Sequence, residues 1–156
     1  EIHKDHFEDV KVTELVERIR SSGINISANY IFGLPMDSQD SMQGTLDFAL
    51  ENMSEMVNVY SAMAYPGSPL YFQAKQNGWE LPSVYAGYSQ HSYETQNLPN
   101  DNLTAAEILK FRDDAWMKYH THEPYLKLLE DKFGIEARNN VESTTKIKLK
   151  RKLLGD

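Results

Sequence analysis

The chain has 156 residues, of which 40% are hydrophobic and 25% are charged, a composition that is ordinary for one soluble globular domain. The formal net charge of −7 argues against a protein that coats DNA or RNA, and no apolar run of about 18 residues is present to span a membrane. The sequence contains no cysteine, which excludes disulfides, thiolate metal sites and any iron–sulfur cluster held by this chain alone.

The chain starts at Glu1 without an initiator methionine, so we expect it to be a piece of a longer protein. No secretory signal is visible, which favours a cytoplasmic location. The charge is uneven, because residues 139–156 carry five basic side chains against two acidic ones. We interpret this basic run as the solvated face of a last helix over residues 140–154 rather than as an anion-binding tail.

The first half of the chain alternates helix and strand patterns. Apolar residues at helical spacing predict a helix over residues 10–19, which Gly23 ends. Residues 24–32 alternate apolar and small polar side chains, a pattern that suits a strand lining the lumen of a barrel. A second strand is predicted over residues 57–65.

The segment between these strands predicts a helix over residues 38–53, with a core-facing stripe of Met42, Leu46, Leu50 and Met53. Strands separated by a helix of this length pair in parallel. A third helix is expected after Pro69, since proline suits a first helical turn. The sequence therefore predicts an α/β layer or barrel.

Two turns break the chain at the carboxyl ends of the predicted strands. Gly33-Leu34-Pro35 follows the first strand, and residues 64–69 follow the second. In α/β folds ligands bind at this edge, where backbone N–H groups are unpaired. On chemistry alone, a purely local turn is the commoner meaning of either motif, and the first is not a P-loop because it lacks the Gly-Lys-Ser/Thr ending.

The second half of the chain has a different character. Residues 79–103 mix aromatic and polar side chains without a clear period, which predicts an ordered or functional loop. A capping box opens a helix over residues 104–122, and another helix is predicted over residues 124–134. We expect the two helices to share one apolar cluster, made of Phe111, Trp116, Tyr125 and Leu129.

One loop carries the residue types of a nucleophilic triad. Ser89, His91 and Glu94 supply a hydroxyl, an imidazole and a carboxylate, but closeness in sequence does not make a triad. A loop histidine that bonds its neighbours is the commoner case. The role of the His91 loop is therefore left open by the sequence.

The remaining histidines and carboxylates predict no metal site. His120 and His122 are two residues apart, which turns their rings away from each other on a helix. We interpret Asp113 and Asp114 as part of a solvated helix face.

Several of these segments together resemble a known family. Residues 28–35, followed by Asp37, Ser41 and Met42, resemble the fifth strand and following helix of radical SAM enzymes. Residues 62–71 resemble the sixth strand and its exit. The similarity to radical SAM proteins with an N-terminal cobalamin-binding domain extends through three further segments, which are residues 88–95, 103–112 and 151–154.

The resemblance implies the last two strand–helix units of a partial (β/α)6 TIM-like barrel over residues 1–78 and a loop with a helical C-terminal extension over residues 79–156. It implies a parent enzyme that binds a [4Fe-4S] cluster and S-adenosylmethionine, with cobalamin in this subgroup. Such an enzyme cleaves S-adenosylmethionine reductively to start radical chemistry on a small-molecule substrate. The family's Cys-x3-Cys-x2-Cys motif is missing here, so we expect the chain alone to be inactive and to hold none of these groups.

The resemblance also implies a set of site residues. Asn29, Ile31 and Gly33 would line the lumen or the cofactor edge, and the backbone of Ala64, Tyr65 and Pro66 would face the adenine. The usual Gly-Leu-Pro-Gly turn departs here, because Met36 replaces the second glycine and disfavours a positive φ.

The residues leave one other function open and disfavour another. The chain could be a stand-alone interaction module that uses the aromatic loop and helix over residues 79–122 against a partner. An aldolase-like half barrel with a lysine Schiff base is disfavoured, since the predicted strand ends carry no lysine. No nucleic-acid or membrane partner is expected, whereas the strand edge of an isolated piece favours pairing between copies.

Overall fold

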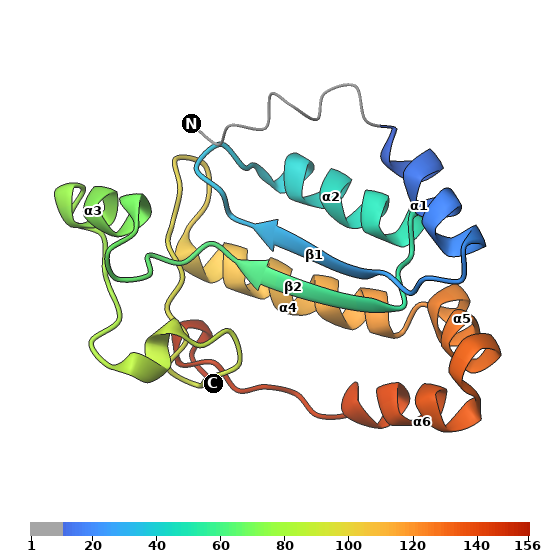
Figure 1. The fold of residues 1–156 in the computed structure, drawn as a ribbon. Coiled ribbons are helices and arrows are strands. Elements are labelled where there is room, and N and C mark those ends of the chain that lie inside the picture. Colours follow the sequence, from blue (N-terminus) through green and yellow to red (C-terminus); the bar gives the residue numbers. More distant parts are fainter. Residues whose placement is uncertain (1–10) are drawn as a thin grey trace.

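The computed structural model describes residues 11–156, in which two parallel strands lie beside a layer of helices (Figure 1). The strands are β1 (Ser27–Phe32) and β2 (Met56–Ser61). The helices are α1 (Val12–Ser21), α2 (Gln39–Glu51), α3 (Pro69–Gln76), α4 (Ala105–His120), α5 (Glu123–Phe133) and α6 (Ile135–Thr144), with short 3₁₀ turns η1 (Tyr85–Tyr88) and η2 (Lys152–Leu154). No helix in residues 11–156 combines the length and apolar character needed to cross a membrane.

The two strands are parallel neighbours, with Ser27 opposite Met56 and Phe32 opposite Ser61, and α2 joins them. This confirms the predicted parallel pairing and connecting helix. Both strands are shorter than predicted. The first begins late because the Ile26 N–H donates to the Glu55 carboxylate rather than to a strand, and it ends where Gly33 takes a φ of +77°. Membership of a six-stranded barrel stays a prediction.

Glu55 fixes the start of both strands from a fully buried position. Its carboxylate accepts hydrogen bonds from Ile26 and from the Lys132 ammonium on α5, and Arg20 on α1 lies 3.9 Å away. Burial alone raises the pKa of Glu55, but the bonds from Lys132 and Ile26 outweigh it and leave the pKa lowered. The carboxylate is therefore charged at neutral pH, and it ties α1, α5 and the segment before β1 to the start of the sheet.

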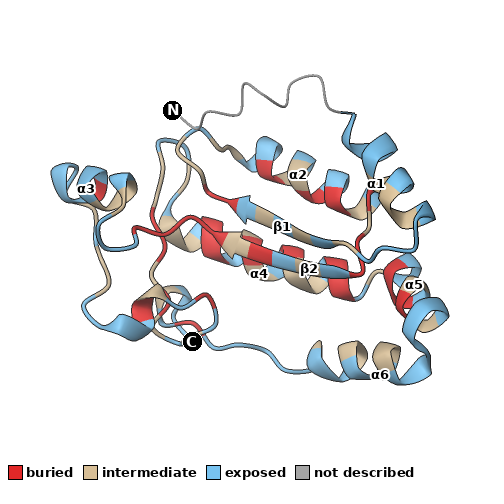
Figure 2. Cartoon of the chain, in the orientation of Figure 1, coloured by how far each residue is buried: buried red, intermediate tan, exposed pale blue. Residues whose placement is uncertain are grey.

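One face of the sheet is covered by α2 and α4, and the other face is open. The covered face carries Phe32 and Val59, which are buried, whereas Asn29, Ile31 and Met56 on the other face are exposed. Figure 2 shows that the buried residues gather on α4, on the end of β2 and on the sheet-facing side of α2. The open face carries polar side chains, Asn29 and Asn58, beside the apolar Ile31 and Met56, and no helix covers it in residues 11–156.

Two neighbouring clusters fill the space between the sheet and its helices, and a third, smaller cluster lies at Ala74 of α3. The first contains Phe32, Met42, Leu46, Val59 and Ala115, and the second contains Ala49, Tyr119, Tyr125, Leu126 and Leu129. The predicted α2 stripe is confirmed for Met42 and Leu46, which are buried, while Leu50 and Met53 are half-buried against the core.

The predicted single cluster of helices α4 and α5 is wrong. Phe111 and Trp116 pack against the first cluster, whereas Tyr125 and Leu129 belong to the second. The reason is geometric: α5 follows the end of α4, so Tyr125 and Leu129 pack with Ala49 and Tyr119 in the last turns of α2 and α4 and not with Phe111 and Trp116.

The predicted last helix over residues 140–154 is also wrong. Helix α6 ends at Thr144, and residues 145–156, here called the C-terminal segment, run extended beneath α4 before the short turn η2 (Figure 1). The basic run is not a helix face. Lys146, Lys148 and Lys150 are exposed, but Arg151 is completely buried, and an extended chain delivers it to its partners.

Replacing Gly33 with alanine should destabilise the fold by more than about 2 kcal/mol, because two penalties add. Alanine disfavours the φ of +77°, and its Cβ would lie 2.5 Å from Cγ2 of Ile108 on α4. Gly67→Ala is the matched control, since Gly67 has a φ of +86° but nothing within 4 Å of a Cβ, and should cost only about 1 kcal/mol. Urea unfolding measures both variants, and equal losses would contradict the close contact with Ile108.

Candidate functional site

A cavity of about 350 Å³ lies at the carboxyl ends of β1 and β2, and we call it the strand-end pocket. Both strands contribute to it, together with the turn after each strand, helix α3 and one residue of the 79–103 loop. Its lining residues are Ile31, Leu34, Tyr60, Ser61, Ala62, Met63, Tyr65, Leu70 and Gln90. This is the edge at which parallel α/β sheets bind ligands.

The structure brings two of the six expected site residues into this pocket, Ile31 and Tyr65. Ile31 reaches it from the open face of the sheet and is 47% exposed. Tyr65 is half exposed, and its ring stacks at 6.1 Å on that of Tyr88 from η1. The aromatic loop thus forms part of the pocket's surroundings.

The other four expected residues do not line the pocket. Asn29 is on the open face, where its Oδ1 accepts a hydrogen bond of 3.0 Å from Asn58. Gly33 is buried against α4. Ala64 is buried in a small cluster with Ala74 and Leu98, and Pro66 is exposed in the turn that follows.

The turn after β1 satisfies its own polar groups. The Leu34 N–H donates to Asp37 Oδ2 at 2.9 Å, and Ser38 caps α2 through the Ser41 N–H. The amide of Asn100 donates to the carbonyls of Leu34 and Asp37. These internal bonds hold the turn in place and occupy the donors that an anion would otherwise use. Met36 is a central residue of this turn, which the Asp37 N–H closes on the Leu34 carbonyl, but its φ is not positive, so the turn does not require the family's glycine there.

Gln90 closes the outer edge of β2 beside the pocket. Its side-chain oxygen accepts from the Ser61 N–H at 3.0 Å, and its side-chain nitrogen donates to the Ser61 carbonyl at 3.0 Å. One buried amide therefore pairs with Ser61 as a neighbouring strand would. Further along the same edge, Arg112 Nε donates to the Val59 carbonyl at 2.8 Å.

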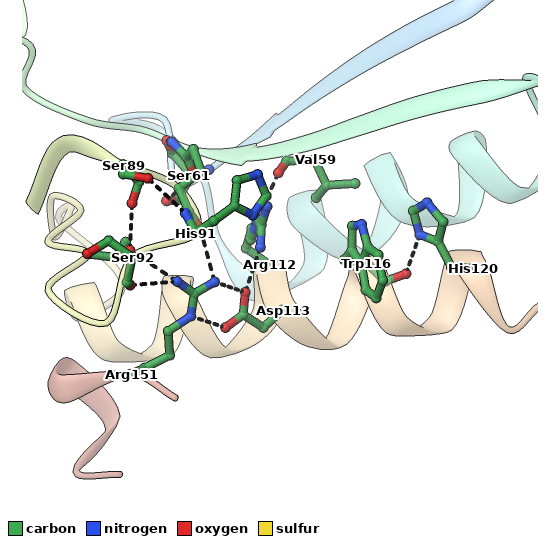
Figure 3. A network of polar contacts seen from close by, with 12 residues as sticks. Val59, Ser61, Ser89, His91, Ser92, Arg112, Asp113, Trp116, His120 and Arg151 are labelled. Atoms are coloured by element: carbon green, nitrogen blue, oxygen red, sulfur yellow. Dashed lines mark hydrogen bonds and ion pairs between the residues drawn. The ribbon is translucent and has the colours of Figure 1, made fainter. Parts of the chain in front are cut away.

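Arg151 holds the Gln90 loop against α4 (Figure 3). All five of its guanidinium N–H groups are bonded, at 2.8 to 3.0 Å: two to the Asp113 carboxylate, two to the carbonyls of Ser92 and Gln90, and one to Thr95 Oγ1. The sequence suggested that Asp113 is part of a solvated helix face. This interpretation is wrong, because the Asp113 carboxylate accepts hydrogen bonds from Arg112 as well as from Arg151. Asp114 alone fits that interpretation, paired with Lys110 on the surface.

His91 does not form a triad with its neighbours. The Ser89 hydroxyl oxygen accepts from the backbone N–H of His91 at 3.3 Å, and the Ser92 hydroxyl oxygen accepts from that of Glu94. Burial and the positive charges of Arg112 and Arg151 lower the pKa of His91, so its ring is neutral at pH 7. His91 therefore forms no triad with Ser89 and Glu94.

His120 is a packed core residue. Its ring stacks at 4.2 Å on Trp116, and its Nδ1 lies 2.8 Å from the Trp116 carbonyl. In residues 11–156, no three histidine or carboxylate side chains come together as metal ligands.

No local pattern in the sequence indicates the roles of Gln90 and Arg112, because they bond residues of β2 that lie 29 and 53 positions away along the chain. For Arg151 the only signal was its place in a basic run, which suggested the opposite environment. Comparison with protein-family models, with curated proteins and with solved structures finds no match for this chain.

Replacing Arg151 with methionine should destabilise the protein by about 3–5 kcal/mol, because it removes this donor from the carbonyls of Ser92 and Gln90 and leaves the Asp113 carboxylate with Arg112 alone. Lys150→Met is the matched control and should change stability by less than about 0.5 kcal/mol, since Lys150 is exposed. Chemical unfolding of the two variants measures the difference. A small loss for Arg151→Met would mean that the C-terminal segment does not hold the loop.

Proposed function

We propose that the chain supplies the last two strand–helix units of a radical SAM barrel and that the strand-end pocket binds the adenosyl part of S-adenosylmethionine. The parent enzyme would cleave S-adenosylmethionine reductively and start radical chemistry on a small-molecule substrate. The observation that carries the proposal is the pocket itself, which joins the carboxyl ends of two parallel strands at the residues that resemble the family.

The two edges of the sheet support this place in a barrel. Hydrogen bonds at both ends of the ladder, from Met56 to Ile26 and from Ala62 to Phe32, place the even-numbered backbone groups of β1 toward β2. The odd-numbered groups of Ser27, Asn29 and Ile31 therefore point to the other edge, where no partner lies in residues 11–156. An edge left open on β1 and sealed on β2 suits a barrel whose preceding strand joins at β1.

The pocket suits a nucleoside in chemistry as well as in place. Ile31, Met63 and Leu70 give it apolar walls, and the rings of Tyr60 and Tyr65 can stack on a base. Beyond Ala62, the backbone N–H and C=O of Met63, a buried residue that lines the pocket, have no hydrogen-bond partner in the described part of the chain. Unpaired buried N–H and C=O groups are costly without a partner, and the edge of an adenine offers complementary ones.

The residues present do not fit the cluster. A [4Fe-4S] cluster of this family needs cysteine thiolates, and the 156 residues contain none, so no step of the reaction is assigned to a cluster here. The resemblance also implies cobalamin, but we identify no residues in this chain that would bind it.

In this proposal, the chain binds the adenosyl group and shields it from water. Ile31 and Tyr60 form a wall on the open face of the sheet, and Gln90 and Arg112 seal the β2 edge, so that water does not reach the strand ends from that side. Bound S-adenosylmethionine would supply the 5′-deoxyadenosyl group, and shielding from water protects such a radical from side reactions.

One observation favours the alternative of a stand-alone interaction module. Tyr85 in the aromatic loop is 92% exposed, and exposed tyrosines are frequent in protein interfaces. The helix that completes the proposed module, α4, buries Ile108 and Ala115 in the core, which leaves its outer side and the loop for a partner.

Titration of the isotope-labelled chain with 5′-deoxyadenosine tests the adenosyl site by NMR. Amide shifts should centre on residues 60–65 and 90, with a Kd of about 1 mM, because only part of the full site is present. Ile31→Ser should weaken binding about tenfold by removing an apolar wall. Met56→Ser is the control, since Met56 is exposed on the same face but outside the pocket.

Two results would count against the adenosyl site. One is the absence of any shift up to the solubility limit of the nucleoside. The other is an equal effect of both substitutions, which would mean that the nucleoside binds the open sheet without using the pocket.

A further inference from the structure

A second and larger cavity, of about 670 Å³, lies between α4 and the C-terminal segment, and we call it the α4 groove. It is separate from the strand-end pocket, and the two have no lining residue in common. Gln90 lines one and His91 lines the other, so one loop divides them. The groove has the size typical of small-molecule sites, about 300–1,000 Å³.

The walls of the groove are held in place at both ends. At one end, Arg151 uses all its donors, and the Lys152 N–H donates to the Tyr93 carbonyl. At the other end, Arg138 on α6 pairs with Glu123, Glu130 and Glu142. The residues between these anchors therefore span a fixed distance along α4.

The span does not collapse onto the helix. Ile147 and Leu149 line the groove opposite Trp116 and Met117, yet Ile147 is 67% and Leu149 38% exposed. Apolar side chains on both walls remain in contact with solvent, although closing the gap would bury them. An apolar body inserted between the walls would remove this exposure.

A buried cation with an unused donor lies at the groove. Arg112 is 3% exposed and lines the cavity; its Nε binds the Val59 carbonyl and its Nη1 binds Asp113. Its Nη2 has no hydrogen-bond partner in residues 11–156. Arg112 and Arg151 share the single carboxylate of Asp113, which leaves this pair of guanidiniums with an excess positive charge.

The rest of the lining does not cancel that excess. Asp114 is paired with Lys110, and the Asp156 carboxylate accepts from the Arg151 N–H. Lys148 adds a further ammonium on the opposite wall. With Arg151 counted, basic groups around the cavity outnumber carboxylates by four to three, in a chain whose net charge is −7.

We propose that the α4 groove binds a small organic anion with an aromatic body, its carboxylate directed to Arg112 and His91 and its ring held between Trp116 and Ile147. A guanidinium with a free N–H group suits a carboxylate, and His91 can add a neutral N–H donor. The body of the ligand replaces solvent between the two apolar walls. This site is independent of the adenosyl site proposed above.

The test is titration of the full chain with 4-phenylbutyrate and with 4-phenylbutylamine, which share a body and differ in the sign of their charge. The anion should bind at least about tenfold more tightly than the amine, with amide shifts on α4 and on residues 145–151. Ile147→Ser should weaken anion binding about tenfold, whereas Ile135→Ser, which removes an exposed isoleucine outside the groove, should not.

A second pair of variants tests the charge. Lys148→Gln should weaken the anion about threefold to tenfold, and Lys146→Gln, equally exposed but outside the lining, should leave it unchanged. Equal affinity for the two probes, or shifts confined to other surfaces, would overturn the proposal. So would a dimer in sedimentation that Ile147→Ser dissociates, because the groove would then hold a second copy of the chain.

Discussion

The parallel pairing of β1 with β2 is the interaction on which the rest of the structure depends. A two-stranded sheet has two outer edges, which carry backbone hydrogen-bonding groups, and two faces, which carry side chains. In this sheet the two edges differ, and so do the two faces. Helices α2 and α4 cover one face through Phe32 and Val59, while the other face is open. The outer edge of β2 is closed by side chains, and the outer edge of β1 has no partner in residues 11–156.

The closed edge explains why distant segments are fixed so firmly. Gln90 and Arg112 bond the outward backbone groups at the carboxyl end of β2, the N–H and C=O of Ser61 and the C=O of Val59, so the loop and α4 must hold constant positions. Arg151 provides this for the loop, with every donor bonded in a buried site. A sealed edge also resists the strand addition to which open edges are prone. The C-terminal segment is thus part of the architecture of the sheet.

The sequence was a good guide where structure follows local pattern. The stripe around Met42 and Leu46 predicted the covering helix, and Pro69 and the capping box at Thr104 predicted helix starts that the structure confirms. It failed where one long-range contact decides. Residues 140–154 have helix-forming composition, yet buried pairing of Arg151 with Asp113 requires an extended chain, and no local pattern records a partner 38 residues away.

The candidate site divides along the same line. Ile31 and Tyr65 could be placed through the resemblance, which assigned them to the edge where the two predicted strands end. Gln90 could not, since a glutamine that mimics a strand looks like any loop residue. Gly33 was assigned to a ligand edge by resemblance, whereas its visible role is to let α4 approach β1 closely through Ile108.

The most direct test of the account is amide hydrogen exchange along β1 in dilute solution. If β1 is the strand at which the rest of a barrel joins, protection should alternate. The amides of Ala28, Tyr30 and Phe32, which face β2, should exchange at least about 100-fold more slowly than those of Ser27, Asn29 and Ile31. Equal protection at odd and even positions would contradict the account, because the edge assigned to the preceding strand would already be paired.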